Sequence, residues 1–419
     1  MALLDTSGSS YRTCTFETVS GERYRWVVLG AGTFAQASFS ASTVGLPALG
    51  PALKSQYGLS LGQTGVVLAA TGIGMLFTLL AWGLIADRVD ERWVIATGLT
   101  GAAAALAIAS TTHSFAALTA ALVATGALGA SVNAASGRAI MAWFPASELG
   151  LALGVRQTAI PVGGALGAVL LPALASAGGT RAAFLFLAGS VAVGAVVAAT
   201  FVRSTGETPQ ADIEEIASPM RDPHMWLLGL GTGLYLVAQI GILNFVVLFL
   251  HDARHVQRAW IVLAVIYVLA SAARIGSGLV SDRLGRRLGP LRAIGAALAV
   301  ATAAVAAATT APLALLIPLF VLAGMLSMSW NGLAYAAAAE AAGTRKTGAA
   351  LGFQQTLLGV VVAGAPPAVA AIATHSWRAA FLAIAAGSAL GVLVLSRLSE
   401  RVRTRGRSET RRATLRTPD

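Results

Sequence analysis

Long apolar runs constrain the fold of this 419-residue chain more than any other feature of its sequence. A helix that spans a bilayer needs about 20 mostly apolar residues, because the hydrocarbon core is about 30 Å thick. The runs are continuously apolar and do not alternate in hydrophobicity, which predicts helices and not a transmembrane barrel. We therefore predict an all-α membrane protein with twelve transmembrane helices. The predicted spans are residues 26–48, 62–86, 93–112, 115–143, 149–173, 181–202, 224–250, 259–281, 289–309, 312–339, 348–373 and 378–397.

The composition excludes several classes of soluble protein. Hydrophobic residues make up 56% of the chain and charged residues only 11%, whereas about a quarter of the residues of a soluble domain are charged. This low share of charged residues excludes a cytosolic enzyme, a disordered protein and a nucleic-acid-binding domain as descriptions of the whole chain. The single cysteine, Cys14, has no partner for an internal disulfide or a zinc cluster. No cofactor and no metal site is predicted.

The basic residues lie mostly on one side of the predicted spans. With the N-terminus placed in the cytoplasm, the opposite loops hold few of the 29 lysines and arginines, namely Lys54, Arg181, Arg254, Arg258 and Arg378. Cytoplasmic loops carry an excess of these residues, so we predict a multi-pass protein of the inner membrane with both termini cytoplasmic. Residues 1–25 are predicted to be a cytoplasmic leader, and residues 398–419 a basic tail that contacts anionic lipid. Nucleic acid is not a predicted partner.

The two halves of the chain resemble each other. "GLIADR" from Gly83 is repeated as "GLVSDR" from Gly278, and "LGVRQT" from Leu153 is repeated as "LGFQQT" from Leu351. Repeats in the same order predict two pseudo-symmetric six-helix bundles, residues 26–202 and 224–397, joined by a cytoplasmic linker at 203–223. This plan is typical of transporters that bind substrate near the midplane, between the two bundles.

The repeated loop resembles the signature loop of the major facilitator superfamily, which reads Gly, three residues, Asp-Arg, one residue, Gly-Arg-Arg/Lys. The second copy fits fully, whereas the first copy has Asp90 in place of glycine and Glu91 in place of arginine. The resemblance implies that Asp87 faces the start of span 348–373 and Asp282 the start of span 149–173. It also implies a cytoplasmic latch that stabilises the outward-facing state; the alternative is ordinary solvated loop charge. The gating residues are Gly83, Asp87, Arg88, Arg92, Gly278, Asp282, Arg283, Gly285 and Arg286.

Three arginines, Arg138, Arg156 and Arg274, fall inside predicted spans. A charge at the centre of a span costs at least ~2.5–3.5 kcal/mol, so such residues mark a substrate pathway or an ion pair. No carboxylate lies at the same depth, because all 18 acidic residues fall in loops, termini or helix ends. We therefore infer that the counter-ion is the cargo. Since arginine forms a bidentate fork for carboxylates, the predicted substrate is a small organic acid.

Helical spacing supports Arg274 most strongly, because Tyr267, Ser271, Arg274 and Gly278 form one stripe. This segment also resembles the eighth span of oxalate/formate-type and monocarboxylate transporters, which implies that Arg274 engages a carboxylate. The alternatives are pairing of Arg274 with Asp282 or with backbone carbonyls. Arg138 could instead anchor at the interface or pair with Glu148. The alternative for Arg156 is a gate ion pair with Asp282 or Glu148.

Uncharged polar residues within the spans complete the predicted lining. Amides in lipid need hydrogen-bond partners, which are substrate or neighbouring helices. Packing between helices is the alternative for each of them. These residues are Gln36, Gln239, Asn244, Asn133, Asn331, Gln157 and Gln355.

The leading hypothesis is a monomeric secondary active or facilitative transporter of a small organic anion, working by alternating access. An exporter of hydrophobic drugs or natural products is the alternative within transport, but such exporters commonly bury a carboxylate in the first bundle. A non-transporting membrane receptor or assembly partner is the alternative from another class. No Walker motif supports ATP-driven pumping. The coupling stays open between antiport, symport and facilitated diffusion.

Overall fold

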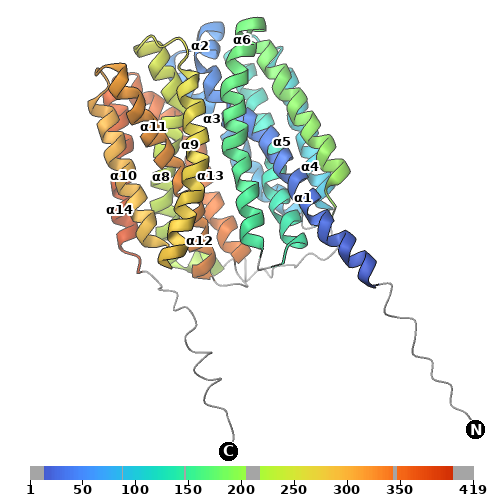
Figure 1. The fold of residues 1–419 in the computed structure, drawn as a ribbon. Helices are drawn as coiled ribbons and strands as arrows, with labels where there is room; N and C mark the ends of the chain where they lie inside the picture. The colour runs from blue at the N-terminus through green and yellow to red at the C-terminus, as the bar shows by residue number, and fades with distance from the viewer. Residues whose placement is uncertain (1–13, 87, 146–147, 204–217, 343–346, 400–419) are drawn as a thin grey trace, which may run out of the picture.

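The computed structural model of the protein describes residues 14–86, 88–145, 148–203, 218–342 and 347–399. These residues form helices and connecting turns and contain no strand. Figure 1 shows long helices running roughly side by side, with α1 beginning and α14 ending at the same end of the molecule. We call that end the terminus end, and the opposite end, which holds α2, the far end. Ten helices are long and apolar enough to cross a membrane, so the all-α membrane fold is confirmed.

The first half of the chain forms six α-helices and one short 3-10 helix. The long α6 corresponds to two predicted spans, because its backbone is non-helical at Gly178 and Gly179. At 53 residues and 1.5 Å per residue, α6 would be about 80 Å long if straight, more than twice the length a bilayer requires. The elements are α1 (Cys14–Thr43), η1 (Leu46–Leu49), α2 (Gly50–Tyr57), α3 (Leu61–Ala86), α4 (Glu91–Ala109), α5 (Phe115–Trp143) and α6 (Leu149–Phe201).

The second half repeats this order of helices. Its predicted span 312–339 is interrupted, because α11 ends at Ser329 and α12 begins at Asn331. The elements are η2 (Ser218–Arg221), α8 (Pro223–Leu248), the π-helical turn η3 (Phe249–Ala253), α9 (Trp260–Leu284), α10 (Leu288–Ala307), α11 (Leu313–Ser329), α12 (Asn331–Ala342), α13 (Thr347–Ala373) and α14 (Trp377–Ser396).

The first predicted span, 26–48, is displaced in the structure. Helix α1 begins at Cys14, inside the predicted leader, and ends at Thr43, before Gly45 and Pro47. Hydropathy marks where apolar residues begin and not where a helix begins, which is why the start was misplaced. The ten membrane-spanning helices include α6 once and do not include α1. If α1 is added and α6 is counted as two spans, the arrangement is consistent with twelve crossings.

Several helix ends carry recognisable capping residues. Ser114 and Ser376 each accept a hydrogen bond from the backbone N–H three residues ahead, at the starts of α5 and α14. Asp222 accepts from the N–H of His224 at the start of α8. These side chains satisfy N–H groups that have no partner inside the helix. Gly285 ends α9 in the left-handed conformation, with a φ of 63°, which glycine adopts without steric cost.

Each half packs mainly on itself, and two pairs of long helices, together with contacts of α2 and η1 with α8, join the halves. Helix α1 packs on α6, α3 on α5, and α10 and α8 on α14, whereas α3 with α13 and α6 with α9 cross between the halves. Small residues permit the close cross-half approach: a Cβ added at Gly65 would lie 2.6 Å from the Ala370 side chain, and one at Gly164 would lie 2.9 Å from the Tyr267 ring. Such close approach of small residues is typical of helix packing in membranes.

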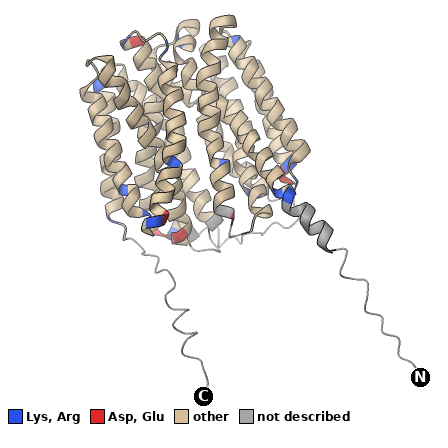
Figure 2. Ribbon diagram, viewed as in Figure 1, with Lys and Arg blue, Asp and Glu red and all other residues tan. Residues whose placement is uncertain are grey.

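Charged residues gather at the two ends of the helices and are sparse in the middle (Figure 2). At the far end, Lys54 of α2 forms a salt bridge with Asp252 of η3, which joins the two halves. At the terminus end, the ion pairs among the described residues stay within one half. They are Arg25 with Glu148, Arg138 with Glu91, and Arg287 with Asp282 and Glu340. Ionic contacts between the halves are therefore found at the far end only, as far as the described residues extend.

Candidate functional site

Arg274 lies in α9, and neutral oxygens from three other helices hold its half-buried guanidinium. Its Nε donates to the Met328 carbonyl at 3.2 Å, its Nη1 to the Gln157 carbonyl at 3.2 Å, and its Nη2 to Asn331 Oδ1 at 2.9 Å. The break between α11 and α12 places Met328 in the last turn of α11, where carbonyls have no partner within the helix. Of the two alternatives expected for Arg274, pairing with Asp282 does not occur, whereas bonding to backbone carbonyls does.

Arg156 lies in α6 and is also held by neutral groups. Its Nε donates to Ser136 Oγ at 2.9 Å, and its Nη2 donates to Gln36 Oε1 at 3.2 Å and to the Asn133 carbonyl at 3.3 Å. The predicted alternative, an ion pair with Asp282 or Glu148, is not formed. Glu148 instead pairs with Arg25 at 3.2 Å, and Asp282 pairs with a different arginine described below.

Tyr335 of α12 brings the two arginine clusters into one site. It interacts electrostatically with both Arg156 and Arg274, and its hydroxyl hydrogen-bonds with the Gln355 side chain of α13. In addition, Arg274 contacts the carbonyl of the residue that follows Arg156. The predicted residues Gln36, Asn133, Gln157, Asn331 and Gln355 therefore meet around two arginines, one from each half of the chain.

The site holds positive charge without a carboxylate. Among the described residues, neither Arg156 nor Arg274 forms a salt bridge. An unneutralised charge is expensive away from water, and hydrogen bonds to neutral oxygens offset only part of that cost. The arrangement is suited to an anion that approaches from outside the protein.

Arg138 does not join this site. It points toward the start of α4, where its Nε lies 4.0 Å from Oε1 of Glu91, whose side chain is only 6% exposed. The expected partner, Glu148, is therefore wrong for Arg138, because Glu91 in the first turn of α4 lies closer and is buried. The structure provides no contact between Arg138 and the other residues of the arginine site.

Three other predicted lining residues have different surroundings. Tyr267 is fully buried, and its hydroxyl donates to the Val44 carbonyl, so that it joins α9 to the end of α1. Gln239 and Asn244 are half-buried in α8. The Oε1 atom of Gln239 is buried and has no hydrogen-bond partner among the described residues. These positions show no contact with Arg156 or Arg274 in the part of the chain that the structure describes.

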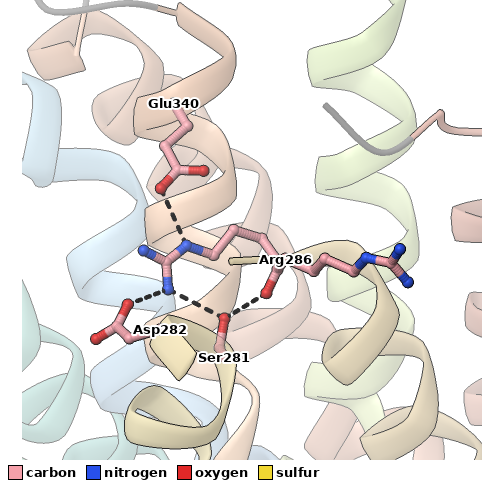
Figure 3. Close-up of polar contacts among 5 residues, drawn as sticks. Ser281, Asp282, Arg286 and Glu340 are labelled. Atoms are coloured by element: carbon pink, nitrogen blue, oxygen red, sulfur yellow. Dashed lines mark hydrogen bonds and ion pairs between the residues drawn. The ribbon is translucent and has the colours of Figure 1, made fainter. Parts of the chain in front are cut away.

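The second signature loop is organised by Arg287, which sequence reasoning missed as a gating residue. Its Nη1 donates to Asp282 Oδ1 at 2.6 Å and to Ser281 Oγ at 3.0 Å, and its Nε donates to Glu340 Oε1 at 3.0 Å. Burial lowers the pKa of Arg287, but hydrogen bonds and charge from Asp282 and Glu340 outweigh it and raise the pKa above its ordinary value. In Figure 3 the Arg286 side chain extends away from this cluster, while its carbonyl accepts from Ser281.

The remaining predicted gating residues make few contacts in this conformation. Asp87 lies outside the described residues, and Arg88, Arg283 and Arg286 are exposed. Arg92 stacks over the Trp93 ring at 4.6 Å. A Cβ at Gly83 or Gly278 would meet nothing within 4 Å. Asp282 pairs with Arg287 here, and among the described residues no ion pair joins a gating residue to the other half.

Ser136, Tyr335, Arg287 and Glu91 are the residues that sequence reasoning did not assign. A weak signal existed for Ser136, which follows Asn133 by three residues and so lies on the same helix face. Arg287 fits the last position of the signature loop, and Tyr335 is an aromatic residue within a predicted span, but neither pattern indicates which side chains they contact. Glu91 stood out only as a departure from the signature loop.

Comparisons with known proteins agree with this architecture. The family model described as Major Facilitator Superfamily matches residues 31–366. Two Mycobacterium tuberculosis proteins, from strains CDC 1551 and H37Rv, are each called an uncharacterized MFS-type transporter. Each is 30% identical over 360 residues, covering 85% of this chain and 81% of the relative.

Solved structures of two transporters share the fold. A bacterial homolog of the human lysosomal transporter Spinster, inward-facing and unoccupied, superposes with a TM-score of 0.71 at 16% identity, covering 89% of this chain and 95% of that one. The D323A mutant of the nucleoside transporter NupG superposes with a TM-score of 0.71 at 14% identity, covering 88% of this chain and 99% of that one. At such identities the likeness concerns the fold alone, whereas the family match spans most of the sequence. This chain belongs to the Major Facilitator Superfamily of membrane transporters.

Proposed function

We propose that the protein moves a small organic anion across the cytoplasmic membrane by alternating access, with Arg274 as the principal binding group. The observation that carries the proposal is the half-buried Arg274 guanidinium, bonded to Met328, Gln157 and Asn331 through neutral oxygens only. Its positive charge is left for a ligand to neutralise. Arginine is suited to this role because its planar fork matches a carboxylate.

The distribution of contacts between the halves supports alternating access. Close helix packing between the halves is found toward the far end, where Gly65 and Gly72 of α3 pack on α13 and Lys54 pairs with Asp252. Toward the terminus end, a Cβ at Gly83 or Gly278 would have open space. Placing both termini in the cytoplasm, as the charge distribution predicts, makes this an inward-facing arrangement. The latch residues would then join the halves in the opposite state.

The anchoring of the bundle in lipid follows from the same orientation. The basic tail, residues 398–419, lies almost entirely outside the described residues, and we propose that it contacts the anionic inner leaflet. We also propose that the protein acts as a monomer, because the arginine site is built within one chain.

Uptake of labelled organic anions into proteoliposomes tests the proposed function. We expect Arg274→Gln to abolish uptake while the protein stays monodisperse in detergent. Arg254→Gln is a matched control, because Arg254 also donates to backbone carbonyls, those of Thr309 and Ala311, but lies at the far end. Unchanged uptake in Arg274→Gln would remove that residue from the binding role. Transport of hydrophobic cations in place of anions would refute the proposed substrate class.

A further inference from the structure

Resting on the proposed function, we propose a narrower substrate class: an organic dianion, such as a dicarboxylate, held at one end by Arg156 and at the other by Arg274. The first observation is that the two arginines belong to different halves of the chain. Arg156 is oriented by α1 and α5, and Arg274 by α11 and α12 and, across the two halves, by the Gln157 carbonyl of α6. A ligand that bridges them would touch both halves at once.

The two arginine clusters lie next to each other, because Arg274 of α9 bonds directly to the backbone of α6 beside Arg156. Tyr335 interacts electrostatically with each of them, and Arg274 bonds to the carbonyl of Gln157, the neighbour of Arg156 in the chain. Gln355 hydrogen-bonds with the Tyr335 hydroxyl. Two positive charges are therefore held near Tyr335 and Gln355, which are both neutral. No carboxylate among the described residues pairs with either arginine.

Some N–H groups of the two arginines have no acceptor among the described residues and can donate to a ligand. A guanidinium has five N–H donors. Arg156 makes three hydrogen bonds, through Nε and Nη2, and Arg274 also makes three. Each arginine therefore keeps two N–H donors without an acceptor among the described residues. The remaining N–H groups of Arg274 are on both Nη1 and Nη2, whereas those of Arg156 are both on Nη1, so each guanidinium can still donate to a carboxylate oxygen of a ligand.

Charge favours a dianion over a monoanion. A monocarboxylate neutralises only one of the two arginines, and the other stays charged in surroundings where charge is costly. A dicarboxylate neutralises both arginines, because each of its carboxylates pairs with one guanidinium. A phosphate monoester also carries about two charges, but it concentrates them on one group, whereas the two guanidinium groups extend from helices of different halves, α6 and α9.

The test is a set of binding measurements on the purified full-length protein, using isothermal titration calorimetry at pH 7.5. The probes are oxalate, malonate, succinate and glutarate, each matched with a monocarboxylate of the same carbon number, and glycerol phosphate. We expect at least one dicarboxylate to bind about tenfold more tightly or better than its matched monocarboxylate. Equal affinities for the matched pairs, or binding of the phosphate monoester in preference to every dicarboxylate, would overturn the proposal.

Variants separate this inference from the proposed function. Arg156→Gln is expected to reduce dicarboxylate affinity about tenfold more than it reduces the affinity for the matched monocarboxylate, so that the preference for the dicarboxylate is lost. Arg156→Lys keeps the charge and should retain part of the preference, which guards against a folding defect in Arg156→Gln. If monocarboxylates bind and require Arg274 but dicarboxylates gain nothing, the dianion inference fails and the proposed function stands. If no anion binds at all, both fail.

Discussion

The salt bridge between Lys54 and Asp252 is expected to hold the far end closed, and its removal should shift the protein toward the state that is open there. Lys54 follows η1 in the first half, and Asp252 lies in the π-helical turn η3 of the second half. The two residues are 198 positions apart, which is also the offset between Leu153 and Leu351 in the internal repeat. The pair therefore joins equivalent positions of the two halves.

The size of the shift follows from the exposure of the two side chains, which are 35% and 25% exposed. Two unit charges 4 Å apart attract by about 4 kcal/mol at an effective dielectric constant of 20. Solvent screening and side-chain entropy reduce the net value of partly exposed pairs to roughly 1 kcal/mol or less. Since 1.4 kcal/mol corresponds to a factor of ten, Lys54→Gln should change the closed-to-open ratio about fivefold at most. Asp252 also hydrogen-bonds with His251. Asp252→Asn therefore weakens two contacts and should change the closed-to-open ratio slightly more than Lys54→Gln does.

Cysteine accessibility measures this shift. The background is Cys14→Ser, which removes the single native cysteine, combined with Ala48→Cys. Ala48 is 5% exposed and lies in η1, which contacts both α6 and α8. In nanodiscs, alkylation of this cysteine by a polar maleimide should become about fivefold faster in Lys54→Gln. Lys54→Arg is the matched control and should not change the rate. An unchanged rate in both Lys54→Gln and Asp252→Asn would refute the reasoning.

Three further substitutions test other parts of the structure. Arg287→Gln removes hydrogen bonds to two carboxylates and should lower the stability of the protein by roughly 1–3 kcal/mol, seen as a lower melting temperature in detergent. Arg283→Gln, at an exposed position of the same loop, should leave that temperature unchanged. Arg138→Gln leaves the buried Glu91 without its nearby positive charge, and should destabilise the protein by about 1–3 kcal/mol without changing anion affinity. The loss of stability should be smaller in the double variant that combines Arg138→Gln with Glu91→Gln, because no unpaired carboxylate is then buried. Tyr235→Phe removes a buried hydroxyl that has no hydrogen-bond partner among the described residues, so its melting temperature should stay the same or rise; a clear fall would show that this hydroxyl is satisfied in the membrane.

The helical fold could be predicted from the sequence because the bilayer requires long apolar helices. Helix ends could not be placed as well. The break within α6 at Gly178 and Gly179 lies between the predicted spans 149–173 and 181–202, but the helix before the break extends beyond residue 173. Helix α1 begins within a polar segment, where hydropathy carries no information about helix formation.

The candidate site could be predicted in part. Arg156 and Arg274 were found because charge inside an apolar run is rare and readily recognised. The partner of Arg138 was missed because Glu91 is distant in sequence and its burial depends on how α4 packs against α5. Tyr335 was not assigned because an aromatic residue in a span is as often packed as functional, and only the tertiary structure places it beside both arginines.

The two arginines differ in what orients them, and this has an evolutionary consequence. Two of the three acceptors of Arg274 are peptide carbonyls, which every amino acid supplies, so mutation of neighbouring side chains leaves them in place. Arg156 depends instead on the side chains of Ser136 and Gln36. Laboratory selection for altered cargo preference should therefore yield replacements around Arg156 well before it yields any around Arg274.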